Sequence, residues 1–112
     1  MPKYLVLYNA EQSAEAQMES NDPAQANEGM RLWMEWADRA GDALVDLGTP
    51  LATGQMVTAD GTSPSSSKAG GYSILQADSA DQVVELLKGH PHLLMPGSTI
   101  EVFEGLELPG GM

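Results

Sequence analysis

Residues 70–91, GGYSILQADSADQVVELLKGHP, combine a strand and a helix in one segment, and the rest of the chain is interpreted outward from them. The run from Tyr72 to Ala77 favours a β-strand with apolar residues on both of its faces. Ser79, with a glutamine three residues later, forms a capping-box pattern that predicts the start of a helix. Gly89 and Pro91 predict where this helix ends.

A first strand and a first helix are predicted before this segment. Residues Lys3 to Tyr8 are apolar at both alternating sets of positions, which is typical of a central strand covered on two faces. Asp22 at the cap position and Pro23 at the first helical position predict a helix that ends at Gly41. The three-and-four spacing predicts its buried face as Met30, Trp33, Met34, Ala37 and Ala40, with Trp36 to one side.

The remaining strands are predicted from short β-favouring runs. Residues 44–47 and 55–59 are two of them, and Asp60-Gly61 is a turn dipeptide. Residues 62–68 hold four serines and a proline, so a mobile loop is expected there. A last strand is predicted at 99–103.

The predicted order is strand, helix, three strands, helix and strand. This order indicates an α+β, ferredoxin-like subunit with a mostly antiparallel sheet and two helices on one face. A chain of 112 residues is long enough for one core. We therefore expect one domain at residues 1–105, followed by a flexible C-terminal tail at 106–112.

Two helices can cover only one face of this sheet. The first strand and the strand at 72–77 are nevertheless apolar on both faces. A second copy of the same sheet, related by a two-fold axis, is the simplest cover for the other face. The sequence thus predicts a homodimer.

The composition disfavours several classes of partner. The chain carries 16 acidic and 5 basic residues, a formal net charge of −11, which repels nucleic-acid phosphates and anionic membranes. Cysteine is absent, so disulfides and cysteine zinc sites are excluded. No apolar run is long enough for a signal sequence or a membrane span, and a cytoplasmic location is expected.

Several segments in this order resemble the YCII-related protein family. The resemblance implies a ferredoxin-like subunit that forms a dimeric α+β barrel. The similar segments cover most of the chain: Lys3–Tyr8, Trp33–Trp36, Gly41–Asp46, Gly48–Leu51, Gly71–Ile74, Ala77–Ser79, Gly89–His92 and Ile100–Val102.

The chain departs from the active-site patterns of that family. One branch of the family is thought to use a histidine early in the first helix and an aspartate before a proline after the second helix. Here the first helix has no histidine, and His90 precedes Pro91. A sister branch carries Asp-Gly-Pro-Phe where this chain has Asp60-Gly61-Thr62-Ser63.

Two residues are candidates for acid/base chemistry. His90 follows the second helix at its negative end, where a protonated imidazole is favoured and could donate a proton near neutral pH. Asp46 lies in an apolar strand run and could act with it if both were buried together. The alternatives are a histidine that only interacts with the last helical carbonyls and an aspartate exposed at a sheet edge.

Four further residues are candidates for a ligand pocket. Tyr8, Trp33 and Tyr72 could wall an apolar cavity, although core packing explains them equally well. His92 follows His90 after one proline, but two histidines without a third ligand are a weak metal signal, so no metal and no cofactor are expected.

The expected function is therefore a homodimer that binds a small organic molecule in a barrel cavity. Cofactor-independent proton transfer by His90 and Asp46 is the catalytic version of this hypothesis. The alternatives are a binding module without chemistry and a structural or interaction subunit whose interior is filled by side chains.

Overall fold

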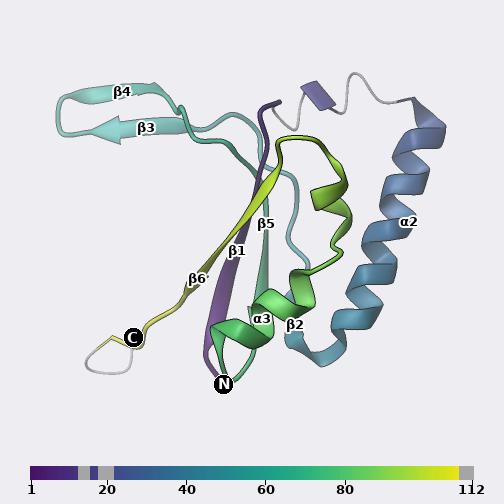
Figure 1. Cartoon of the computed structure of the whole chain (residues 1–112). Coiled ribbons are helices and arrows are strands. Elements are labelled where there is room, and N and C mark those ends of the chain that lie inside the picture. The colour runs from purple at the N-terminus through teal and green to yellow at the C-terminus, as the bar shows by residue number, and fades with distance from the viewer. Residues whose placement is uncertain (13–15, 18–21, 109–112) are drawn as a thin grey trace.

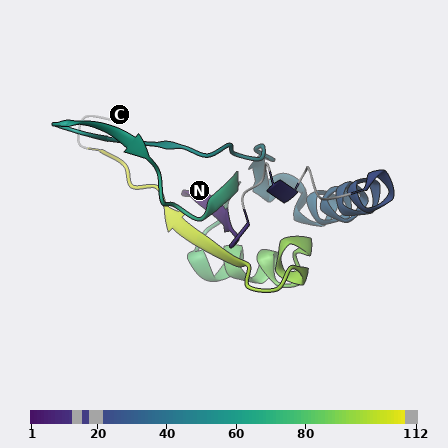
Figure 2. The ribbon, with the colours of Figure 1, turned by 90° about the horizontal axis from the view of Figure 1, so that it is seen from above.

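The structure is a computed structural model that describes residues 1–12, 16–17 and 22–108 (Figure 1). Two helices and four strands build its main body, and a separate two-stranded hairpin extends from it (Figures 1 and 2). Their bounds are β1 Lys3–Asn9, α2 Pro23–Ala40, β2 Leu44–Asp46, β3 Gln55–Thr58, β4 Gly61–Pro64, β5 Ala69–Gln76, α3 Ala80–Leu87 and β6 Thr99–Glu104.

The main sheet has the strand order β2-β5-β1-β6, and all neighbouring strands are antiparallel. Each helix connects two strands that are not neighbours, α2 between β1 and β2 and α3 between β5 and β6. Two such split units in one sheet are the ferredoxin-like arrangement. The predicted α+β fold with both helices on one face of an antiparallel sheet is confirmed (Figure 2).

The core lies between this sheet and the helices. Alternation along β1 places Tyr4, Val6 and Tyr8 on the helix side, where all three are buried. The register places Leu75 of β5 opposite Tyr4, so the two buried sets meet across the central strand pair. Leu5, between them in sequence, points to the opposite face and is 40% exposed.

Helix α2 begins as the sequence predicts. The Asp22 side chain accepts a hydrogen bond from the Gln25 backbone N–H, and the Gln25 side chain accepts from the Asp22 N–H, which completes a capping box. The predicted buried face was wrong in part, because Met30 and Met34 are exposed while Trp36 is 2% exposed. The helix is rotated so that its two tryptophans and its small residues face the sheet. The small residues allow the helix to lie close to the strands.

The capping hydrogen bonds of helix α3 differ in one detail from the predicted capping box. Ser79 Oγ accepts from the Gln82 N–H as predicted, but the Gln82 side chain accepts from the Asp78 N–H, one residue before the cap. Val83 is buried, whereas the neighbouring Val84 is exposed.

The region between β2 and β5 differs most from the prediction. A loop was expected at 62–68, but its first residues belong to β4, Gly61–Pro64, which pairs with β3 in a hairpin. The Thr58 side chain supports the turn, because its hydroxyl accepts from the Asp60 N–H and donates to the Gly61 carbonyl. The predicted strand at 55–59 therefore belongs to a separate hairpin and not to the main sheet.

The predicted limits of the domain and its tail stay predictions. Leu106 and Leu108 are exposed, and residues 109–112 of the expected tail lie outside the described residues. Within the described ranges, no helix is both long and apolar enough to span a bilayer.

A substitution at Gly48 tests the close approach of the backbone after β2 to the backbone of β5. The φ of Gly48 is +80°, and a Cβ there would lie 1.7 Å from the Tyr72 carbonyl oxygen. We expect Gly48→Ala to lower the free energy of unfolding by at least about 2 kcal/mol. Gly29→Ala is the control: it lies in α2 with no atom within 4 Å of the added carbon, and it should stabilise by about 0.5–1 kcal/mol. Urea unfolding measures both, and an unchanged midpoint for Gly48→Ala would contradict this packing.

Candidate functional site

A buried polar link on the helix side of the sheet joins β1, β5 and the residue that follows β2. The Tyr8 hydroxyl donates to Ser73 Oγ at 2.8 Å, and Ser73 Oγ donates to the Leu47 carbonyl at 2.6 Å. Tyr8 and Ser73 are both buried. Burial raises the pKa of Tyr8 to about 12, so its hydroxyl keeps its proton at neutral pH. The link fixes the tyrosine ring in place.

His90 lies against this tyrosine and is completely buried. Its Nδ1 accepts a hydrogen bond from the backbone N–H of His92 at 2.9 Å. The neutral ring therefore carries its proton on Nε2. Among the described residues, Nε2 has no hydrogen-bond partner. The site thus contains a buried N–H donor that no acceptor in the described part of the chain uses.

Three aromatic rings surround His90. The ring centroids of Trp33 and Trp36 lie 4.5 Å from the imidazole centroid, and that of Tyr8 lies 4.9 Å away. Trp36 is itself anchored, because its Nε1 donates to the Leu86 carbonyl at 2.8 Å. Helix α2 supplies both tryptophans, and β1 supplies the tyrosine.

The environment of His90 determines its charge. Burial, followed by electrostatic interactions with His92 and Arg39, lowers the pKa of His90 to about 3. His90 is neutral at pH 7. The expectation of a protonated imidazole that donates its proton near neutral pH was therefore wrong, because desolvation outweighs the helix end.

His90 is nevertheless a capping residue. It caps the start of the 3₁₀ helix Pro91–Leu94 through the His92 N–H. The alternative prediction was a cap on the last carbonyls of α3. The side chain is instead the cap of the helical turn that follows it.

His92 is held on the other side of Tyr8. Its Nε2 lies 2.9 Å from the Asn9 carbonyl, which can only accept, so this nitrogen carries a proton. Its ring centroid lies 5.4 Å from that of Tyr8. The Ser98 hydroxyl also donates to the His92 carbonyl. The turn at 90–92 is therefore tied to the end of β1.

The structure brings four of the six predicted residues together: Tyr8, Trp33, His90 and His92. Tyr72 alternates with Ser73 on β5 and points to the opposite face of the sheet. Asp46 is exposed, and its Oδ1 accepts from the Gly48 N–H at 2.9 Å, so it matches the sheet-edge alternative. The aspartate and His90 have separate partners. Their joint acid/base role stays a prediction that this geometry does not support.

Trp36 and Ser73 complete the cluster and were not among the predicted site residues. A signal for Trp36 existed, because it stands four residues before Ala40 and three after Trp33 on one helical face. Ser73 is the polar residue among Tyr72, Ile74 and Leu75. The strand pattern alone does not indicate which partner it would find. We call the six residues Tyr8, Trp33, Trp36, Ser73, His90 and His92 the histidine cluster.

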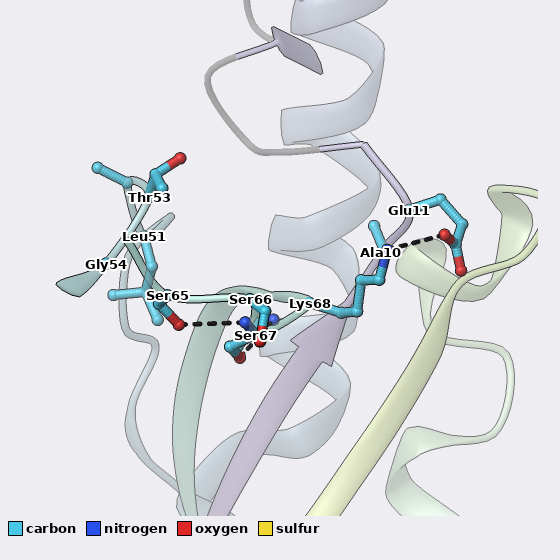
Figure 3. A pocket seen from close by; sticks show the side chains of 11 residues that line it. Ala10, Glu11, Leu51, Thr53, Gly54, Ser65, Ser66, Ser67 and Lys68 are labelled. Atoms are coloured by element: carbon cyan, nitrogen blue, oxygen red, sulfur yellow. Dashed lines mark hydrogen bonds and ion pairs between the residues drawn. The ribbon is translucent and has the colours of Figure 1, made fainter. Parts of the chain in front are cut away.

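A hollow of about 330 Å³ lies outside the histidine cluster, at the base of the hairpin (Figure 3). An ion pair between Lys68 Nζ and Glu11 at 3.0 Å closes one side of it. Asn9 separates the hollow from His92, since Ala10 lines the hollow and the Asn9 carbonyl contacts the imidazole. Its lining residues are Ala10, Glu11, Leu51, Ala52, Thr53, Gly54, Ser65, Ser66, Ser67, Lys68 and Ala69.

A second hollow, of about 470 Å³, lies at the other end of the sheet near Met1, Gln76 and Leu86. None of the six predicted site residues lines either hollow. In the described part of the chain, no three His, Asp or Glu side chains are grouped to hold a metal ion.

No protein-family model and no curated protein matches the chain. A solved structure does resemble it: 5-chloro-2-hydroxyhydroquinone dehydrochlorinase (TftG) from Burkholderia phenoliruptrix AC1100, in complex with 2,5-dihydroxybenzoquinone. The two chains are 12% identical, the match covers 100% of each, and the TM-score is 0.58. At this identity the likeness shows the fold alone.

The pKa of His90 predicts how stability depends on pH. The unfolded chain takes up a proton near pH 6.5, whereas the folded chain excludes it down to about pH 3. The stability that neutral His90 provides is therefore complete above pH 6.5 and is lost as the pH falls toward 3, by up to about 1.4 kcal/mol per pH unit.

His90→Asn keeps a side-chain acceptor for the His92 N–H but does not titrate. We expect its free energy of unfolding, measured in urea from pH 7.5 to 4.5, to fall less steeply with pH than that of the wild type. In the folded wild type, the ring proton signals of His90 should not titrate between pH 5.5 and 8. A midpoint near 6.5 would contradict a neutral, desolvated ring.

Proposed function

We propose that this protein is a small-molecule-binding homodimer whose ligand is a planar ring with a carbonyl or hydroxyl oxygen, bound at the histidine cluster. The unpartnered Nε2–H of His90 carries the proposal. A buried donor without an acceptor costs about 1–3 kcal/mol. A ligand oxygen would remove this cost, and the surrounding aromatic rings would stack on a planar ligand.

The protonation state of His90 favours binding over acid catalysis. With a pKa of about 3 the ring holds no spare proton at pH 7, but its Nε2–H can donate a hydrogen bond. In a reaction, this donor would stabilise negative charge that develops on a ligand oxygen. Asp46 is not placed to act as its base. We therefore place the binding module ahead of the proton-transfer enzyme.

The structural neighbour supports this ligand class. TftG was solved with 2,5-dihydroxybenzoquinone, a ring that carries both carbonyl and hydroxyl groups. Entry of such a ring would displace Trp33, the outermost ring of the histidine cluster, which is only partly buried.

The homodimer is proposed from the uncovered face of the sheet, the open face. Leu5 lies there between Ile74 and Phe103, and Leu7 lies opposite Tyr72. Leu5 and Phe103 are 40% and 49% exposed in the single chain. A second copy would cover this apolar row and close a dimeric α+β barrel.

A cytoplasmic location, with which the lack of cysteine is compatible, stays part of the proposal.

One observation favours a structural subunit instead. The centroids of the three surrounding rings lie 4.5–4.9 Å from the centroid of the His90 imidazole, which is the spacing of packed aromatic pairs. In that case the Nε2–H would point at an aromatic face, a weak hydrogen bond. No ligand would then be needed.

A titration with 2,5-dihydroxybenzoquinone separates these possibilities. The two tryptophans of the chain both lie in the histidine cluster, so their fluorescence reports on it alone. We expect saturable quenching, matched by calorimetry, and binding about tenfold weaker in His90→Asn because one hydrogen bond is lost.

Two controls locate the binding. Tyr72→Phe, on the open face, and Lys68→Gln, in the hollow of Figure 3, should leave the affinity unchanged. Weaker binding only in Lys68→Gln would place the ligand in the hollow. No binding to the wild type would contradict this ligand class and favour the structural subunit.

Leu5→Asp tests the dimer. A charge in the middle of the open face should produce monomers at concentrations where the wild type has twice the chain mass by light scattering. Val84→Asp is the matched control, because Val84 is similarly exposed but lies on α3. A monomeric wild type, or a dimer unaffected by Leu5→Asp, would contradict pairing through this face.

A further inference from the structure

The β3–β4 hairpin lacks a core of its own. Its strands pair with each other and with no strand of the main sheet, and all eight strand residues are exposed. Val57 is 73% exposed and Met56 is 47% exposed. An isolated two-stranded hairpin is at best marginally stable in water. We call residues 55–64 the arm.

The root of the arm is held to the main sheet by backbone hydrogen bonds. The Leu51 N–H donates to the Gly70 carbonyl, and Pro50 forms a bridge with Gly71, so the chain leaves from the edge of the main sheet. The Ser65 N–H then donates to the Gly54 carbonyl and closes the base of the arm. A fixed root sets the direction in which the arm extends.

That direction leads to the open side of the sheet. The arm extends away from α2 and α3, which lie on the other side (Figures 1 and 2). The radius of gyration is 15.5 Å, above the roughly 13 Å of a compact chain of this length. A partner packed on the open face would therefore lie within reach of the arm.

The arm also avoids the charge of the rest of the chain. From Leu47 to Ser67, Asp60 is the one charged residue, whereas the chain has a net charge of −11. Two acidic copies repel each other, so an arm that carries one charge and exposes Val57 and Met56 is the segment best suited to contact a second copy.

We propose that the arm of each subunit reaches across the two-fold axis and packs on the second copy, forming a second part of the dimer interface. This inference rests on the proposed homodimer. The partner subunit is thus the protein that packs against the arm. Each subunit covers the exposed apolar side chains of its partner's arm.

Val57→Asp tests this contact in the full chain. We expect its dimer dissociation constant, measured by sedimentation over a dilution series, to rise at least tenfold relative to the wild type. The matched control Val84→Asp should stay within twofold. If Val57→Asp dimerises as tightly as the wild type, the arm contact is wrong although the dimer stands.

Hydrogen exchange provides a second measurement that does not depend on a substitution in the arm. Amides of residues 55–64 should exchange at least tenfold more slowly in the wild-type dimer than in monomeric Leu5→Asp. Equal exchange in both would overturn the arm contact. A wild type that is monomeric at every concentration would instead overturn the proposed dimer, and the arm contact with it.

Discussion

Strand β1 lies at the centre of the sheet and carries apolar side chains on both faces, so cover on both faces is favourable. Helices α2 and α3 meet this need on one face, where Tyr4, Val6 and Tyr8 are buried. On the other face, Leu5 lies between Ile74 and Phe103, whereas Leu7 lies between Tyr72 and Glu101. Both leucines keep contact with solvent. This imbalance underlies both the proposed pairing and the position of the arm.

The His-Pro-His turn illustrates how burial overrides local electrostatics. The end of a helix favours a cation by about 0.3–1 kcal/mol, and by about 2 at most. A pKa of about 3 in place of 6.5 at His90 corresponds to roughly 5 kcal/mol against the charged form. The desolvated ring is consequently a hydrogen-bond donor and not an acid.

This change of role also changes the chemistry that the site can perform. A neutral Nε2–H among aromatic faces can recognise an oxygen on a planar ring, whereas proton transfer would need a group that titrates near pH 7. The hydroxyl link from Tyr8 through Ser73 to the Leu47 carbonyl keeps the floor of the histidine cluster rigid. The geometry is thus better suited to holding a ligand than to moving its protons.

The sequence by itself determined the features that depend on near neighbours in the chain. The caps at Asp22 and Ser79, the strands at 3–8 and 72–77 and the overall fold could all be predicted, because capping and alternation are local. Only the tertiary structure decided the rotation that buries Trp36 instead of Met34, the separation of the arm from the main sheet, and the different partners of His90 and Asp46. These outcomes depend on contacts between residues distant in sequence, and periodicity carries no information about which distant surface a side chain will meet.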